Sequence, residues 1–78
     1  MNTIAVIEQA VSKLDGPARE LALDFSAVVR IDAPAIRALE NLAGAAERKS
    51  VAISLRNVNI EVYKVLKLVK LTPRFSFQ

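Results

Sequence analysis

The sequence predicts a small α/β domain, a mostly parallel sheet packed with helices in the order α-β-α-β-α-β. The first reason is that apolar residues recur at helical spacing in three segments, residues 2–15, 33–48 and 60–70. The second is that short runs of mainly aliphatic and aromatic residues follow these segments, at 19–25, 51–55 and 74–77. Strands that alternate with helices are typical of βαβ crossovers, which make neighbouring strands parallel. We expect residues 1–78 to form a single domain.

The first helix and the strand after it have recognisable ends. Gly16, followed by Pro17, is expected to supply the C-cap conformation of the helix. The run Leu21–Phe25 is brief and mostly apolar, which is typical of a strand covered on both faces. In the connection after it, Val28 and Val29 suggest partial inward packing. The apolar face of the first helix is expected to carry Ile4, Ile7, Val11 and Leu14, although the alternative is that Ile4 to Ile7 begin as a short strand.

The second helix has a clear start. Asp32 is a good N-cap, and Pro34 is tolerated only in the first turn of a helix. Gly44 lies within the helix and is expected to allow a close approach to the sheet, and Lys49 with Ser50 should end the helix. The apolar stripe comprises Ala35, Ile36, Leu39, Leu42, Ala43 and Ala46.

The third helix follows a turn at residues 57–59, where Asn59 is the expected cap. Thr72 and Pro73 break this helix before the last short strand. Tyr63 is expected to pack rather than react. The apolar face of the helix should comprise Val62, Val65, Leu66 and Val69, with Lys64, Lys67 and Lys70 on the opposite side.

The composition argues against an enzyme. The chain has no cysteine and no histidine, which removes thiol nucleophiles, the commonest general base and the commonest metal ligand. No serine has a base near it in sequence, and there is no Gly-rich phosphate loop. We therefore expect no catalysis, no cofactor and no metal. The chain also has no apolar run of the roughly 18–20 residues that a membrane span needs, and its N-terminus does not resemble a signal peptide, so we expect a cytoplasmic protein.

Basic residues are concentrated at the C-terminal end. Residues 1–50 carry six Lys/Arg and seven Asp/Glu, whereas residues 51–78 carry five and one. Such a face could meet an acidic partner or anionic lipid, although a solvated helix surface is the plainer interpretation. We expect no nucleic-acid binding, because aromatic residues make up only 5% of the chain and do not alternate with the basic ones. The basic residues are Arg56, Lys64, Lys67, Lys70 and Arg74.

Asp24 and Asp32 bracket the connection after the first strand. Two carboxylates there could bind Mg²⁺ or serve acid–base chemistry. The simpler interpretation is that one shapes the turn and the other caps the helix, and the absence of a phosphate loop or histidine favours it.

From Glu20 onward the chain resembles the STAS domain, the fold of bacterial anti-sigma factor antagonists. The resemblance is carried by the strand triplet Leu23-Asp24-Phe25, by Val28, and by the pair Ile31-Asp32 before a helix. Val62, Leu66 and Leu71 match the C-terminal pattern of the family. The resemblance covers roughly residues 20–78.

The resemblance also shows where the chain departs from the family. STAS domains usually open with two strands, and this chain starts at the position of the helix that follows them, so the domain is expected to be truncated. The shortened sheet should expose an unpaired edge, for which we expect a homodimer or a complex that covers it. Glycines common in the family are replaced by Ala35, Ser50 and Lys70.

The most consequential departure is at Ala33. In the antagonists the residue after the aspartate is a phosphorylated Ser or Thr, and phosphorylation there abolishes docking by repulsion and desolvation. Ala33 has no hydroxyl, so no phosphorylation is expected at this position.

The resemblance therefore implies a non-catalytic regulatory module that binds a protein partner, such as an anti-sigma factor or related kinase-like regulator. The alternative is the small cytoplasmic STAS subunit of a phospholipid-transport ABC complex, which SAV-x-R-I-D and N-V-N-x-x-V-Y resemble; its partner would be the ABC ATPase. A nucleotide-binding regulatory STAS domain has less support. The expected partner-binding residues are Ser26, Arg30, Asp32, Ala33, Pro34, Ala35, Ile36 and Arg37.

Overall fold

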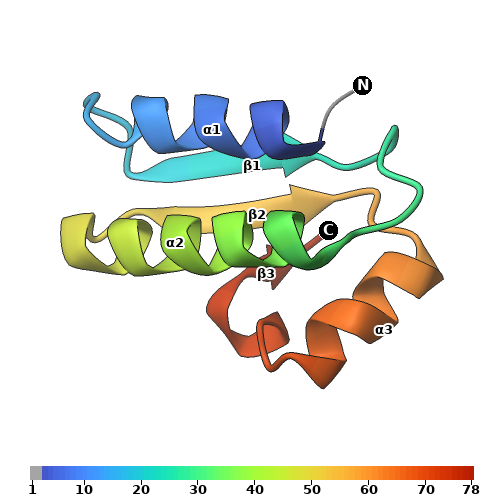
Figure 1. Ribbon diagram of the computed structural model, residues 1–78. Helices are drawn as coiled ribbons and strands as arrows, with labels where there is room; N and C mark the ends of the chain where they lie inside the picture. Colours follow the sequence, from blue (N-terminus) through green and yellow to red (C-terminus); the bar gives the residue numbers. More distant parts are fainter. Residues whose placement is uncertain (1–2) are drawn as a thin grey trace.

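Three helices alternate with three strands in the computed structural model, which describes residues 3–78 (Figure 1). This is the predicted order α-β-α-β-α-β, and the α/β prediction is confirmed. Residue 2, expected in the first helix, lies outside the described residues. The elements are α1 (Thr3–Lys13), β1 (Glu20–Asp24), α2 (Ala33–Lys49), β2 (Ala52–Arg56), α3 (Ile60–Leu68) and β3 (Ser76–Phe77).

The strands form one parallel sheet in the order β1-β2-β3. Glu20 pairs with Ala52 and Asp24 with Arg56, so β1 and β2 match over their full lengths. β3 adds only two pairs, Ser54 with Ser76 and Leu55 with Phe77. The carboxyl ends of β1 and β2 thus reach the same end of the sheet, where the loops leading into α2 and α3 begin (Figure 1).

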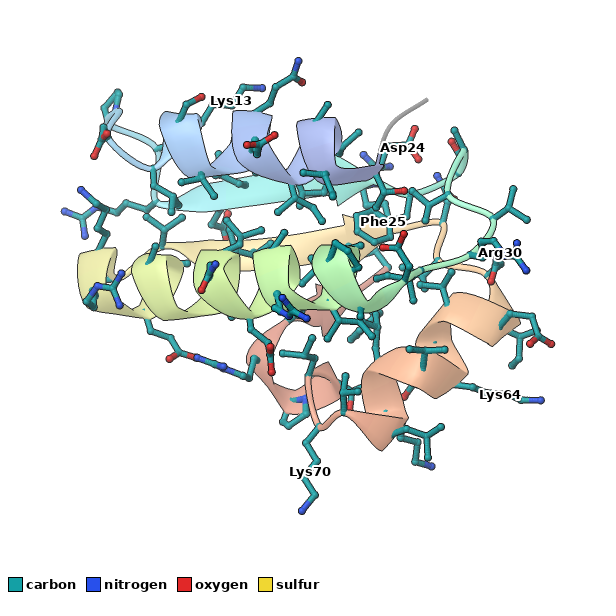
Figure 2. The ribbon with its side chains drawn as sticks, in the orientation of Figure 1. Lys13, Asp24, Phe25, Arg30, Lys64 and Lys70 are labelled. Carbon is teal, nitrogen blue, oxygen red and sulfur yellow. The ribbon has the colours of Figure 1, made fainter. Side chains whose placement is uncertain are left out.

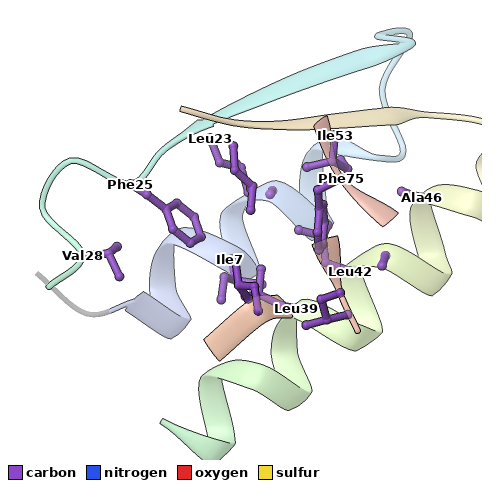
Figure 3. Packing of buried hydrophobic residues seen from close by; sticks show 14 of the residues in the cluster. Ile7, Leu23, Phe25, Val28, Leu39, Leu42, Ala46, Ile53 and Phe75 are labelled. Atoms are coloured by element: carbon purple, nitrogen blue, oxygen red, sulfur yellow. The ribbon is translucent and has the colours of Figure 1, made fainter. Parts of the chain in front are cut away.

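The hydrophobic core lies between the sheet and the helices (Figure 3). Helix α1 and helix α2 cover the same side of β1 and β2, and α3 contributes Val62 and Leu66 to the same cluster. Leu39, Leu42 and Leu55 are completely buried. Of the stripe predicted for α2, Ile36 is half-buried and the other residues are buried, which confirms the helical periodicity.

The opposite face of the sheet is open, so the expectation of a strand covered on both faces is wrong. Ala22, Ser54 and Ser76 lie in register across the three strands on this face. Ala22 and Ser76 are exposed and Ser54 is half-buried, whereas Leu23 and Leu55, on the helix side, are buried. The helices pack on one side of the sheet because the large apolar side chains of the strands point to that side.

Both glycine expectations are also wrong. Gly16 does not have a positive φ, and the end of α1 is closed instead by a hydrogen bond from its N–H to the carbonyl of Lys13 at 3.1 Å. A Cβ at Gly44 would lie 3.5 Å from Nη1 of Arg48, so this glycine faces the next turn of its own helix rather than the sheet.

Two apolar positions and the last strand also differ from expectation. Val11 and Val69 are 38% and 36% exposed, and on α1 the inward place is taken by Ala10, which is 1% exposed. Residues Thr72–Arg74 form a short 3-10 helix, which confines β3 to Ser76–Phe77. Pro73 explains this, because it cannot donate a hydrogen bond to a sheet.

Candidate functional site

The loop that leaves β1 is shaped by Asp24. Its carboxylate Oδ1 accepts a hydrogen bond from the N–H of Ser26 at 2.9 Å and one from Nδ2 of Asn57 at 3.2 Å. These bonds, the backbone bond of Ser26 above all, hold the pKa of the Asp24 carboxyl below its usual value. Val28 then turns inward and donates its N–H to the carbonyl of Phe25 at 2.9 Å. The path of the loop is therefore set within four residues of the strand.

Asp32 ends the loop and caps α2. Its Oδ1 accepts from the N–H of Ala35 at 3.0 Å, and its carbonyl accepts from Ile36 at 2.9 Å, as expected for an N-cap residue. Pro34 lies in the first turn, where its missing N–H removes no helical bond. Together with the bonds of Asp24, this confirms the interpretation that one carboxylate shapes the turn and the other caps the helix.

Asn59 joins this loop to α3. Its Oδ1 caps α3 by accepting from the N–H of Val62 at 2.8 Å, as expected. The Nδ2 of the same side chain donates to the carbonyls of Val28 and Val29, both at 3.1 Å. Sequence reasoning missed this second role. The available signal was the choice of asparagine, because its amide can cap with its oxygen and donate with its nitrogen, which aspartate cannot do.

The residues expected to bind a partner form a largely exposed surface at the start of α2. Ala35 is the exception: it is 1% exposed and belongs to the core, so its side chain is not available to a partner. Ile36 is half-buried and packs against the core cluster. Figure 2 shows Arg30 extending away from the body of the molecule beside the start of α3. The exposed members are Ser26, Arg30, Asp32, Ala33, Pro34 and Arg37.

Two large apolar side chains add to this surface and were not expected there. Val29 is 75% exposed and Ile60 is 66% exposed. They belong to neighbouring segments, because Asn59, which directly precedes Ile60, donates to the carbonyl of Val29. A shallow groove begins at Ile60 and continues past Val58 and Tyr63 to Phe77. Tyr63 and Phe77 make an edge-to-face contact with centroids 5.2 Å apart, which confirms that Tyr63 packs.

The predicted basic face is divided in the structure. Arg74 makes two hydrogen bonds to the carboxylate of Glu47, from Nε at 3.0 Å and from Nη2 at 2.9 Å. This pairing lowers the pKa of Glu47 and raises that of Arg74. Arg56 pairs in register with Asp24 at the end of β2. The lysines of α3 and the residue after it, Lys64, Lys67 and Lys70, are therefore left as a separate group.

Comparison with known protein families identifies the chain. The family model described as "Mlab, STAS domain" matches residues 1–73. The chain belongs to the STAS domain family. The match begins at residue 1 rather than near residue 20, so it includes α1 as well as the segments that carry the resemblance. No curated protein and no solved structure shows a significant similarity to the chain.

Membership of the family places the site in context. STAS domains are in general non-enzymatic regulatory modules, and the match supports a regulatory module of the STAS type for this chain. Ser50 and Lys70, two of the residues expected to replace glycines of the family, have φ values of 57° and 62°. Both therefore adopt the left-handed conformation that glycine favours. Ala33, at the position expected to be phosphorylated in the antagonists, lies exposed in the first turn of α2. No helix within residues 3–78 is long and apolar enough to cross a membrane.

Proposed function

We propose that this STAS domain is a non-catalytic, cytoplasmic module that binds a protein partner at the start of α2. Its docking surface comprises the exposed side chains Ser26, Val29, Arg30, Asp32, Ala33, Pro34, Arg37 and Ile60. The observation that carries the proposal is the exposure of Val29 and Ile60 at 75% and 66%, beside a charged helix start. Apolar side chains ringed by polar ones are typical of surfaces that bury on association.

The surface is held in one shape before any partner binds. Asp24 fixes the beginning of the loop, Asp32 fixes its end, and Asn59 ties its middle to α3. A surface that is already ordered loses less conformational entropy on binding. This supports docking of a partner rather than folding of the loop around it.

The first candidate partner is an anti-sigma factor or a related kinase-like regulator. In that case Ala33 leaves the domain in a permanently binding-competent form, because no phosphate can be added there. The substitution Ala33→Asp tests this. We expect the aspartate to weaken binding of the partner at least tenfold, since it adds an uncompensated charge to the contact.

The second candidate partner is the ATPase of a phospholipid-transport ABC complex. The observation that favours it is that the two segments resembling that branch, residues 26–32 and 57–63, are joined by the hydrogen bonds of Asn59 to Val28 and Val29. Residues 26–32 and 57–63 therefore lie side by side and form one continuous surface.

One experiment separates the two candidates and tests the surface. The tagged protein and its Ala33→Asp variant are used to capture partners from native lysate, followed by mass spectrometry. Recovery of a sigma-regulating kinase by the unmodified protein supports the first candidate, and recovery of an ABC ATPase supports the second. Capture that is equal for both proteins would remove the start of α2 from the interface. Turnover of a nucleotide by the pure protein would contradict the non-catalytic assignment.

We also propose that a partner strand covers the edge of β1. The carbonyl of Arg19 accepts from the N–H of Ala52, and the N–H of Phe25 donates to the carbonyl of Arg56. The backbone N–H and C=O groups of the odd-numbered residues of β1 therefore point toward β2. The backbone groups of Glu20, Ala22 and Asp24 consequently point away from the sheet.

Of the two occupants expected, a homodimer and a complex with another protein, the charges favour the second. Antiparallel pairing of β1 with a second copy over all five residues would place Glu20 opposite Asp24, and like charges directly opposite each other are destabilising. Light scattering at micromolar concentration decides between them. We expect a monomer for the isolated protein, and a dimer that persists after Ala22→Pro would contradict pairing through this edge.

A further inference from the structure

The outward side of α3 carries lysines and an unusually exposed leucine. Leu68 is 81% exposed, more than the other large hydrophobic residues of the described chain. Lys64 and Lys67 line the same shallow surface hollow as Leu68. At about 100° per residue, these three side chains lie within an arc of about 100° on the helix. Figure 2 shows Lys64 and Lys70 extending away from the core, Lys64 to the right and Lys70, which follows the helix, downward, so the charged surface wraps around the end of α3.

The lysines are not used inside the protein. Within residues 3–78, the ion pairs of the structure join Lys49 to Asp15 and Arg74 to Glu47, and none involves Lys64, Lys67 or Lys70. None of the three side chains donates a hydrogen bond to the described part of the chain. The single acidic residue of α3 is Glu61, in its first turn and at the other end from Leu68. The last half of α3 therefore presents an uncompensated positive charge.

Lys70 has a backbone conformation that is unfavourable for lysine. Its φ is 62°, in the left-handed region that favours glycine and that costs a lysine free energy. Backbone strain at a residue is a reason to ask whether its side chain has a role. A glycine would be preferred by the fold, and it would remove the third charge of this face.

We propose that this face, Lys64, Lys67, Leu68 and Lys70, binds the surface of an anionic phospholipid bilayer. The lysines would lie among the headgroup phosphates, and Leu68 would enter the layer beneath them. Lysine is a flexible point charge, which suits a diffuse anionic surface, whereas fixed carboxylates are usually recognised by the planar fork of arginine. Nucleic acid offers no apolar layer for Leu68. Lys67, Leu68 and Lys70 lie at or after the last turn of α3, away from Ile60, whereas Lys64 lies one turn from Ile60.

The test is sedimentation of the full chain with vesicles of phosphatidylcholine containing 30% phosphatidylserine, against vesicles of phosphatidylcholine alone. Each lysine near such a surface raises partitioning about fivefold, so the variant Lys64→Gln/Lys67→Gln/Lys70→Gln should bind roughly 100-fold more weakly. Leu68→Ser should weaken vesicle binding about tenfold without changing the net charge. Binding should weaken with added salt.

A matched control separates this face from net charge. The variant Lys13→Gln/Arg19→Gln/Arg48→Gln also removes three positive charges, all from exposed residues away from α3. We expect it to retain most of the vesicle binding. Circular dichroism checks that both triple variants stay folded, as their surface positions predict.

Three results would overturn the proposal: equal loss of binding in the two triple variants, full binding by Leu68→Ser, or no binding of the unmodified protein to anionic vesicles at millimolar lipid. Retention on polyglutamate or RNA that depends on the same lysines, with no vesicle binding, would likewise assign the face to another partner.

Discussion

The helices α2 and α3 start in the same way, but only one of the two starts reaches across the molecule. Asp32 and Asn59 both have extended backbones and both accept from the N–H three residues on, at 3.0 and 2.8 Å. The bonds of Asp32 stay within its own helix. Asn59 also donates to two carbonyls about 30 residues earlier in the chain. Two caps of equal local quality therefore differ in what they do for the docking surface: one begins a helix, and the other also positions a loop.

The largest effect is expected at Asn59. Asn59→Ala should lower the free energy of unfolding by about 2–3 kcal/mol, since it loses a cap worth about 1 kcal/mol and two hydrogen bonds of similar value. Asn59→Asp should keep the cap and lose about 1–2 kcal/mol, because a carboxylate cannot donate to the carbonyls. Urea denaturation measures both. Equal stability of Asn59→Asp and the unmodified protein would show that the cross-chain bonds contribute nothing.

Asp32 should behave differently under the same pair of changes. Asp32→Ala should cost about 1 kcal/mol through loss of the cap. Asp32→Asn should be within about 0.5 kcal/mol of the unmodified protein, since asparagine caps equally well and there is no second bond to lose. Equal changes in the free energy of unfolding for Asp32→Asn and Asn59→Asp would show that the two caps have the same role.

The two helices differ at their starts, but both are followed by a residue in the left-handed conformation. Ser50 follows α2 and Lys70 follows the last turn of α3, and both have positive φ. Ser50→Gly and Lys70→Gly should each raise the free energy of unfolding by about 0.5–1 kcal/mol, because glycine relieves the left-handed strain. Thermal melting measures the gain. Only Lys70→Gly should also weaken vesicle binding, and a parallel loss in Ser50→Gly would mean that the strain at Lys70 serves no binding role.

The features that could be read from the sequence are those determined by neighbouring residues. Asp32 with Pro34 located the start of α2 to the residue, and the periodicity of α2 identified its buried face. The role of Asn59 in holding the loop could not be found in this way, because its partners are 30 and 31 residues away. The adjacent valines make the same point: Val28 is 3% exposed and Val29 is 75% exposed, although both are apolar residues of one loop.

The open face of the sheet was missed for a related reason. A short apolar strand looks alike whether one or two helical layers cover it, and the deciding residue, Ala22, is small enough to be tolerated inside or outside. Gly16 and Gly44 were misjudged because glycine permits unusual backbone conformations and close contacts without requiring them.

The smallest effect is expected at Asp24, whose hydrogen bonds also join the loop after β1 to the turn before α3. Because Asp24 titrates, the strength of this connection depends on pH. Asp24 accepts from Ser26 and Asn57, so it joins the same two segments as Asn59, but with a charged group. Its pKa in the folded state is lowered, first by the Ser26 N–H and then by the Asn57 amide. A carboxyl with a lowered pKa stabilises the fold above its unfolded pKa, and this contribution is lost as the pH falls below about 4. Asp15 and Glu47, whose pKa values are also lowered, contribute with the same sign.

Asp24→Asn removes the charge but keeps an oxygen that can accept from Ser26. We expect the melting temperature of the variant to fall less between pH 7 and pH 3 than that of the unmodified protein, so that the difference between the two proteins narrows as the pH falls. The effect should be small because the carboxylate is exposed to solvent. An identical pH dependence in both proteins would show that the amide of Asn59, which does not titrate, holds the loop without help from Asp24.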